Sequence, residues 1–208
     1  MSTPKFRNYH RALIAFQRIR EIIQFFIRNF DAPYPTFIKR KTLVAHSILE
    51  ASWIETGTYM GSTSQFLAKR YPKVTTIEPS EYFFKFSESR LKRNKRVVTL
   101  FGSSEVHFEN VLIGNHDEVN IWLDGHFSDG GTFLGENVSP IIHELEMIAQ
   151  HKSKFRLITV FIDDVRLFQR DPLHATGYPP FVFLLDWSQA NGFVWEIQND
   201  IFIAKYAR

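Results

Sequence analysis

The sequence predicts an α/β fold: a doubly wound sheet that is mostly parallel and ends in an antiparallel hairpin. The first observation behind this prediction is that short segments rich in apolar and β-branched residues alternate with helical segments between Trp53 and Asp164. The second is a pair of strand-like segments near the C-terminus, joined by Asn199 and Asp200. Strands and helices that alternate in this way form parallel pairs through right-handed crossovers, with helices on both faces of the sheet.

The composition fits one folded α/β domain and excludes several kinds of site. The chain has 208 residues, of which 44% are hydrophobic and 21 are phenylalanine, which is enough for a sizeable core. It contains no cysteine, so disulfides, thiolate metal sites and a cysteine nucleophile are excluded. The formal charge of +3 is modest, whereas a nucleic-acid binder usually carries a focused basic face. We therefore expect no nucleic-acid partner.

The apolar stretches of the chain are far shorter than the ~20 residues that a membrane-spanning helix needs. Charged residues interrupt each apolar stretch of the N-terminal region. We therefore expect a soluble protein without membrane insertion, and the lack of cysteine fits a cytoplasmic location.

The N-terminal region predicts two helices. Apolar residues recur at spacings of three and four in residues 9–30, with arginines mostly between them, which is typical of an amphipathic helix. The prolines of segment 31–35 end that helix, because proline cannot continue it, and a second helix is predicted over residues 37–50. Residues 1–50 are therefore expected to form a lid over a site or a surface for a homodimer, and residues 51–208 to form the sheet domain. A helix pair that only packs on the sheet domain, without a role at the site, is the alternative.

The sheet domain contains the alternating elements. The predicted strands are one that ends at Glu55 and then residues 74–78, 97–101, 119–124, 157–164, 193–198 and 201–206. One predicted helix runs from Gly61 to about Tyr71. The others follow Ser80 and Gly102 and cover about residues 140–150 and 180–190, with Ser80 as an N-cap.

The segment after the first strand has the sequence Glu55-x-Gly57-x-x-x-Gly61. Its glycines have no Cβ and can adopt positive φ, so a small molecule can lie against the backbone. Ser62 and Thr63 are expected to cap the following helix, whose N-terminal N–H groups then face the same crevice. The segment therefore predicts a nucleotide-like ligand at the end of this strand.

Carboxylates follow four of the five strands that alternate with helices. Any one of these acids is explained equally well as a favourable charge at the start of the next helix. Ligands of doubly wound sheets, however, bind beyond the carboxyl ends of the strands, so acids on four strands favour a functional site at this edge. The acids are Glu55, Glu78, Asp124 and the pair Asp163 and Asp164.

These motifs resemble those of the class I S-adenosylmethionine-dependent methyltransferases. The matching pattern is Glu55-Thr-Gly57-Thr-Tyr-Met-Gly61, Thr76-Ile-Glu78, Gly102-Ser-Ser104 and Asp124, at the ends of strands one to four. Segments 122–131, 140–145 and 162–164 more narrowly resemble small bacterial methyltransferases of glycan and polysaccharide biosynthesis. The resemblance covers about residues 40–206 and implies a Rossmann-like, seven-stranded methyltransferase sheet.

The resemblance implies that S-adenosylmethionine is the cofactor. Gly57 would let its methionine end lie on the loop, and Glu55 would accept a hydrogen bond from its amino group or from an ordered water. Glu78 would accept hydrogen bonds from both ribose hydroxyls. The glycine spacing differs from the Gly-x-Gly-x-x-Gly of NAD-binding folds, so NAD is disfavoured. The implied cofactor-binding residues are Glu55, Gly57, Thr58, Tyr59, Gly61, Ser62, Glu78, Ser103, Ser104 and Asp124, with the serines at 103 and 104 near the adenine.

The resemblance also implies methyl transfer to a hydroxyl group. The sulfonium already activates the methyl, so in-line positioning does most of the work, but a hydroxyl acceptor must also lose its proton. Asp124, Asp163 and Asp164 match the three oxygen ligands of metal-dependent O-methyltransferases, and such oxygens suit Mg²⁺. His126 stands where some sugar O-methyltransferases carry an acid that acts as a base, and an imidazole exchanges protons readily near neutral pH.

Two departures from those families leave the metal open. Phe127 stands where the catechol enzymes carry a lysine, and His126 replaces the second acid. The site is therefore either metal-free, with Asp124 orienting His126, or it uses His126 as a ligand. A histidine ligand would favour Mn²⁺, Fe²⁺ or Zn²⁺ over Mg²⁺.

We therefore expect an O-methyltransferase that acts on a sugar, a glycan precursor or another small acceptor, with Asp124 and His126 as catalytic residues. One alternative is a nucleic-acid or small-molecule N-methyltransferase. A nucleic-acid N-methyltransferase would normally carry an Asn/Asp-Pro-Pro-aromatic motif where residues 124–127 read Asp-Gly-His-Phe. Another alternative is a non-catalytic protein that binds S-adenosylmethionine and acts through partners.

Overall fold

The computed structural model describes residues 4–124, 140–168 and 178–208, with side chains from residue 12 onward. The strands are β1 (Ser52–Thr56), β2 (Val74–Glu78), β3 (Val97–Phe101), β4 (Asp117–Leu123), β5 (Phe155–Ile162), β6 (Val194–Gln198) and β7 (Ile201–Ala207). The helices are α1 (Pro4–Ile27), α2 (Thr36–His46), α3 (Ser62–Leu67), α4 (Glu81–Leu91), α5 (Ser104–Ile113), α6 (Ile141–His151) and α7 (Phe181–Asn191), with short 3₁₀ turns η1 (Lys152–Lys154) and η2 (Val165–Leu167).

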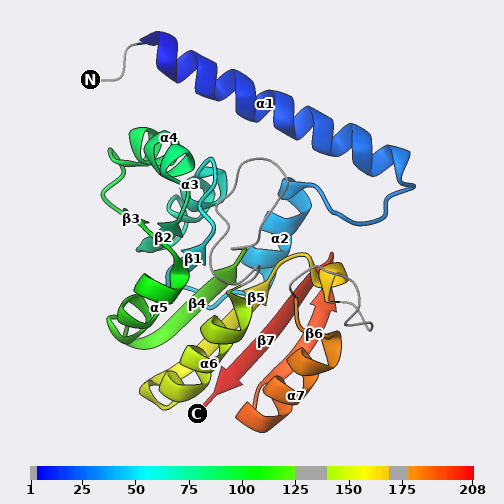
Figure 1. Ribbon diagram of the computed structural model, residues 1–208, viewed down its shortest axis with the longest axis vertical. Coiled ribbons are helices and arrows are strands. Elements are labelled where there is room, and N and C mark those ends of the chain that lie inside the picture. Colours follow the sequence, from blue (N-terminus) through cyan, green and yellow to red (C-terminus); the bar gives the residue numbers. More distant parts are fainter. Residues whose placement is uncertain (1–3, 125–139, 169–177) are drawn as a thin grey trace.

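The strands form one seven-stranded sheet in the order β3-β2-β1-β4-β5-β7-β6, which confirms the predicted fold (Figure 1). Strands β1 to β5 pair in parallel, while β7 pairs antiparallel with both β5 and β6. The chain adds β2 and β3 on one side of β1 and then returns to place β4 on the other side. In a doubly wound sheet the ligand crevice lies at such a reversal, beyond the carboxyl ends of the strands.

The C-terminal hairpin forms where the sequence predicts it. Gln198 pairs with Ile201 across a two-residue turn. The turn residues Asn199 and Asp200 have φ values of 53° and 64°. A two-residue hairpin turn of type I′ has positive φ at both positions, and asparagine and aspartate tolerate this conformation better than most residues.

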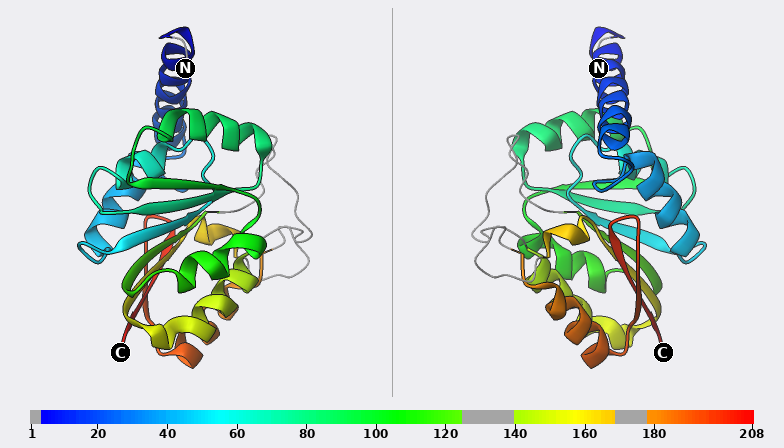
Figure 2. Two further views of the ribbon diagram at one scale, coloured as in Figure 1. Left: turned by 90° about the vertical axis from the view of Figure 1, so that its left-hand side faces the viewer. Right: turned by 90° about the vertical axis from the view of Figure 1, so that its right-hand side faces the viewer.

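Two apolar clusters hold the helices against opposite faces of the sheet (Figure 2). On one face, α5, α6 and α7 contribute residues such as Phe108, Leu145 and Leu184. On the other face, Leu43 of α2 and Leu67 of α3 pack against buried strand residues. Because side chains alternate along a strand, neighbouring strand residues enter different clusters, as a sheet covered on both faces requires.

Helix α1 lies outside the layers that flank the sheet (Figures 1 and 2). The helix predicted from the apolar periodicity is present. Most of the apolar side chains of α1, however, remain exposed rather than packing on the described part of the chain. Those exposed by 37% or more are Phe16, Ile19, Ile22, Ile23, Phe26 and Ile27, and Phe30 follows the helix. The expected lid or dimer role of residues 1–50 stays a prediction.

Within the described residues, none of the helices combines the length and the hydropathy that crossing a membrane would require.

Three local predictions need correction. Helix α2 ends at His46 instead of about Glu50, and α3 ends at Leu67, before the predicted Tyr71. Ser62 and Thr63 do not cap α3, since its N-cap is Gly61, which has φ of 66° and offers no side-chain hydrogen bond. The Ser62 hydroxyl instead accepts a hydrogen bond from Arg40. Ser80, by contrast, does cap α4: its hydroxyl accepts from the N–H of Phe83.

Candidate functional site

The predicted carboxylates meet at one edge of the sheet. β1 lies between β2 and β4, and β4 also pairs with β5, so the strands that carry these acids are neighbours. The backbone continues the ladder past the strand ends: the N–H of Asp124 donates to the carbonyl of Thr56 at 3.2 Å, and the N–H of Asp163 donates to the carbonyl of Leu123 at 3.0 Å. The three strands therefore present their terminal residues side by side.

The loop after β1 is held tightly against β2. The N–H groups of Gly57 and Thr58 both donate to the carbonyl of Ile77, at 3.0 and 3.3 Å. Gly57 and Gly61 have φ values of 82° and 66°, in the region that favours glycine. A Cβ built on Gly61 would lie 2.8 Å from Cδ1 of Leu91 in α4, so this position also needs glycine for packing.

Glu78 joins this loop to the end of β2. One carboxylate oxygen accepts from the N–H of Tyr59 at 2.6 Å, and the other accepts from the N–H of Ser80 at 2.9 Å. Burial raises the pKa of Glu78 above its ordinary value, and the two backbone donors partly offset this effect. The carboxylate is therefore oriented by the backbone on both sides.

Glu55 lies deeper than its neighbours at this edge. It is 1% exposed, and its carboxylate accepts a hydrogen bond from the hydroxyl of Ser64 in α3. Burial raises the pKa of Glu55 to about 7, and hydrogen bonds from Ser64 and Thr76 partly counteract the rise. A carboxyl group that titrates near neutrality inside a crevice is typical of functional sites, although structural carboxyls also show it.

The two serines after β3 lie next to the Glu78 strand end. The N–H of Gly102 donates to the carbonyl of Glu78 at 3.1 Å, which brings the start of α5 beside the end of β2. Ser103 is the N-cap of α5 without a side-chain hydrogen bond, and Ser104 is the first residue of the helix and is buried. Their predicted contact with adenine stays a prediction.

The structure places at this site a cation that the sequence motifs do not predict. The ammonium of Lys39, in α2, lies 2.6 and 2.7 Å from the two carboxylate oxygens of Asp163 and 2.8 Å from Oδ1 of Asp164. Burial disfavours the charged lysine, but the charges of Asp163, Asp164 and Asp124 outweigh burial and raise the pKa of Lys39 above its ordinary value. Lys39 precedes the buried Leu43 by one helical turn, and that spacing was the signal available in the sequence.

Asp164 is also held by a second cation. Nη1 of Arg166 donates to Oδ1 of Asp164 at 2.7 Å and to a carboxylate oxygen of Asp200 in the hairpin turn. The backbone N–H of Arg166 donates to the other oxygen of Asp200 at 3.0 Å. These contacts tie the end of β5 to the β6–β7 hairpin.

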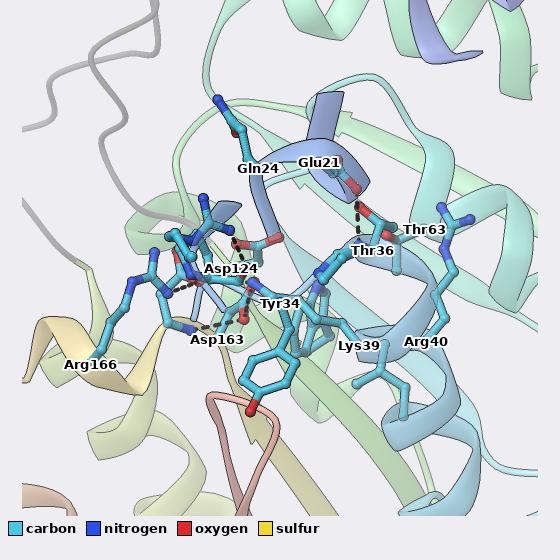
Figure 3. Close-up of a pocket in the computed structure, with 16 residues that line it drawn as sticks. Glu21, Gln24, Tyr34, Thr36, Lys39, Arg40, Thr63, Asp124, Asp163 and Arg166 are labelled. Carbon is cyan, nitrogen blue, oxygen red and sulfur yellow. Dashed lines mark hydrogen bonds and ion pairs between the residues drawn. The ribbon is translucent and has the colours of Figure 1, made fainter. Parts of the chain in front are cut away.

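A cavity of about 290 Å³ opens beside Asp124 (Figure 3). Helices α1 and α2, the first turn of α3 and the ends of β4 and β5 border it. The N-terminal helices are linked at its rim, where the N–H of Thr36 donates to Glu21 at 2.9 Å. Among the described residues, its charged lining consists of the carboxylates of Glu21, Asp124, Asp163 and Asp164 and the cations Arg28, Lys39, Arg40 and Arg166.

Two predicted features of the site have different outcomes. His126 lies outside the described residues. In the part of the chain that the structure describes, His, Cys, Asp and Glu form no group of three or more arranged to hold a metal ion. The oxygens of Asp163 and Asp164 that a metal would use are already in contact with the Lys39 ammonium, so the donor set as it stands does not fit a divalent ion.

The sequence matches no protein-family model and no curated protein. Similar solved structures include the O-methyltransferase TomG from Streptomyces achromogenes, involved in tomaymycin synthesis and bound to S-adenosylmethionine. The match has a TM-score of 0.54 at 18% identity and covers 86% of this chain and 85% of that chain. The methyltransferase domain of bacterial CtHen1-CN has a TM-score of 0.51 at 13% identity, over 82% of this chain and 98% of that chain.

A precorrin 8W decarboxylase from Methanobacterium thermoautotrophicum has a TM-score of 0.50 at 15% identity, over 86% of this chain and 93% of that chain. Identities this low establish the fold. The chain therefore has the fold of the class I S-adenosylmethionine-dependent methyltransferases.

Proposed function

We propose that the protein is an S-adenosylmethionine-dependent O-methyltransferase that acts on a sugar, a glycan precursor or another small hydroxylated acceptor. The observation that carries this proposal is the cavity beside Asp124, which adjoins the first turn of α3 and is lined by charged groups of both signs. An apolar acceptor would remove those charges from water without replacing their hydrogen bonds, at a high cost in free energy. A molecule with several hydroxyls both donates and accepts hydrogen bonds, so it suits such a lining.

The geometry of Glu78 supports the cofactor part of the proposal. Each carboxylate oxygen has two acceptor positions, and one on each oxygen is used by the N–H of Tyr59 or Ser80. The remaining position on each oxygen suits one of two neighbouring ribose hydroxyls. The loop from Gly57 to Gly61 would then carry the methionine end towards Asp124.

The reaction needs a proton acceptor besides the positioned donor. Asp124 directly follows β4 and lines the cavity, and His126 comes two residues later in the sequence. We assign His126 as the general base and Asp124 as the residue that orients it. The acceptor oxygen would lose its proton to the imidazole as it attacks the methyl carbon, and the sulfonium would leave as a neutral thioether.

Calorimetry with S-adenosylmethionine and with S-adenosylhomocysteine tests the cofactor assignment. We expect saturable binding of one molecule per chain. The absence of binding by either compound would reject every methyltransferase alternative, as well as a non-catalytic protein that binds this cofactor.

A screen of hydroxylated sugars and of amines, with release of S-adenosylhomocysteine as the signal, tests the acceptor class. Turnover with amines alone would favour the N-methyltransferase alternative. With an accepted sugar, His126→Ala should lower turnover by ~10²–10⁴ while cofactor affinity stays unchanged. His116→Ala, an exposed histidine at the start of β4, is the matched control and should keep full activity.

A further inference from the structure

The pair of carboxylates after β5 already contains a cation. The Lys39 ammonium contacts both oxygens of Asp163 and one oxygen of Asp164 at 2.6–2.8 Å. The Lys39 side chain is 14% exposed, and those of Asp163 and Asp164 are 4% and 9% exposed. Lys39, Asp163 and Asp164 therefore form a largely buried cluster, to which Arg166 adds a second cation at Oδ1 of Asp164.

The local backbone brings the two carboxylates to the same point. Asp163 and Asp164 are consecutive. Asp164 has φ of 53°, in the left-handed region that residues other than glycine adopt at a cost in free energy. The N–H of Asp164 donates to Oδ1 of Asp163 at 2.8 Å and stabilises this turn. Two carboxylates held this close repel each other unless a cation lies between them.

Lys39 comes from an element that is fixed in place. Leu43, one turn later in α2, is 1% exposed in the core. The hydroxyl of Thr42 accepts a hydrogen bond from Asn199 of the hairpin turn at 2.9 Å. The start of α2 is fixed as well, because the N–H of Thr36 donates to Glu21 of α1. The ammonium is therefore positioned by packing on both sides.

A divalent metal bound by these acids would need the same oxygens. Mg²⁺ binds carboxylate oxygens at about 2.0–2.1 Å and Ca²⁺ at about 2.3–2.6 Å. An ammonium already within 2.8 Å of three of these oxygens leaves no room for such an ion. Together with Arg166, which donates to Asp164, it also offsets the two negative charges that would attract a metal.

We propose that Lys39, the cation that bridges Asp163 and Asp164, occupies the position of a divalent metal, so that this site binds no metal. Lys39 acts as a positioning residue: it holds the two carboxylates at the wall of the cavity beside Asp124. The inference rests on the proposed function, because it concerns the acceptor side of the same site.

Titration with Mn²⁺, followed by calorimetry and by electron paramagnetic resonance, tests this proposal in the full chain without cofactor. The unmodified protein should bind no Mn²⁺ at this site. Lys39→Met, of similar length but uncharged, should bind one Mn²⁺, at least about tenfold more tightly than any residual Mn²⁺ binding by the unmodified protein, and adding Asp163→Asn should abolish the gain. Lys41→Met, an exposed lysine of the same helix, is the matched control and should gain nothing.

The proposal is overturned if the unmodified protein binds Mn²⁺ in a manner that Asp163→Asn abolishes, or if folded Lys39→Met gains no site. A second measurement needs no variant at position 39: amine acetylation of the unmodified protein, read by mass spectrometry. Lys39 should be acetylated much more slowly than Lys41, with and without added Mg²⁺. Faster modification of Lys39 on adding Mg²⁺ would show that the metal displaces it and would also overturn the proposal.

S-adenosylhomocysteine binding by the same samples separates the two proposals. If S-adenosylhomocysteine binds but the Mn²⁺ titration contradicts the expectation, only the role of Lys39 is rejected. If the Mn²⁺ titration agrees but S-adenosylhomocysteine does not bind, only the proposed function is rejected.

Discussion

Burial changes the pKa of Glu55, the carboxyl group that is predicted to accept a hydrogen bond from the cofactor. At 1% exposure it is shielded from water, and burial raises its pKa to about 7. The group is therefore partly protonated in neutral solution. A bound positive charge near it would favour the ionised form.

Cofactor binding should consequently depend on pH. Below pH 7 the Glu55 carboxyl in the free protein is mostly neutral. Glu55 must therefore lose its proton before it can pair with the positively charged amino group of the cofactor. We expect the affinity for S-adenosylhomocysteine to fall about tenfold between pH 8 and pH 6. Calorimetry across this range measures it, and Glu55→Gln should remove the pH dependence. An affinity that is already constant in the unmodified protein would contradict the assignment of Glu55.

Glu78 should contribute more directly to cofactor affinity. Hydrogen bonds to a charged group are worth about 1.5–3 kcal/mol, so Glu78→Gln should weaken binding of S-adenosylhomocysteine by roughly 10–100-fold. The amide also places its NH₂ group towards one of two backbone donors, Tyr59 or Ser80. Glu81→Gln, an exposed neighbour paired only with Lys85 in the described structure, is the control and should bind normally. Equal affinities in the two variants would exclude Glu78 from the ribose site.

Among the secondary-structure elements, α4 packs against the loop before α3 at a position that requires glycine. Gly61 precedes α3 with φ of 66°, and an added Cβ would lie 2.8 Å from Leu91 and 3.2 Å from Ser87 of α4. Gly192, after α7, has φ of 74°, but an added Cβ there would meet nothing within 4 Å. The two positions share the backbone conformation and differ in packing.

Alanine at these glycines should separate conformational strain from overpacking. Gly192→Ala should lower the free energy of unfolding by about 1–2 kcal/mol through the left-handed conformation alone. Gly61→Ala should add an overpacking cost of about 1–3 kcal/mol. Denaturation by guanidinium measures both variants. If the two variants lose the same free energy of unfolding, α4 moves away from the loop at Gly61 without an energetic cost.

At the scale of the whole molecule, α1 presents an apolar surface that the described part of the chain does not cover. Phe16 and Ile27 are 68% and 74% exposed. A groove of about 700 Å³ lies beside it. Its apolar lining comes from Ile22 of α1, Phe37 and Val44 of α2, and Phe66 of α3, and charged residues also border it: Arg18, Glu21, Arg40, Lys41 and Arg70. Contiguous exposed apolar surface of this kind is typical of a protein interface.

We expect this surface to mediate the predicted homodimer. Sedimentation equilibrium should show a dimer, and Phe16→Glu combined with Ile27→Glu should shift it to the monomer, because burying these charges in an apolar interface is unfavourable. Val194→Glu places the same charge at an equally exposed apolar residue of β6 and should leave the dimer intact. A monomeric unmodified protein would refute the prediction.

Much of the fold could be predicted because its signals are local. β-Branched runs predict the strands, and Asn199–Asp200 predict the turn that joins β6 to β7. The ends of helices were less predictable: α2 stops at His46 although helical periodicity continues, because Ser47 is extended and Ile48 bonds to Asn120 of β4. Such a contact between distant residues leaves no signal in the helical segment itself.

The alternation of strands and helices is enough to predict that the acids of β1, β2, β4 and β5 share one edge, since parallel strands joined by helices have their carboxyl ends together. The contacts that those acids make could not be predicted in this way. Lys39 and Asp163 are 124 residues apart, and their ion pair depends on how α2 packs on the sheet. Helix α1 is a second example. The sequence predicts its apolar stripe, but whether that stripe is exposed depends on what packs against it. Periodicity is encoded locally, but the pairing of charges and surfaces is settled by packing between distant segments.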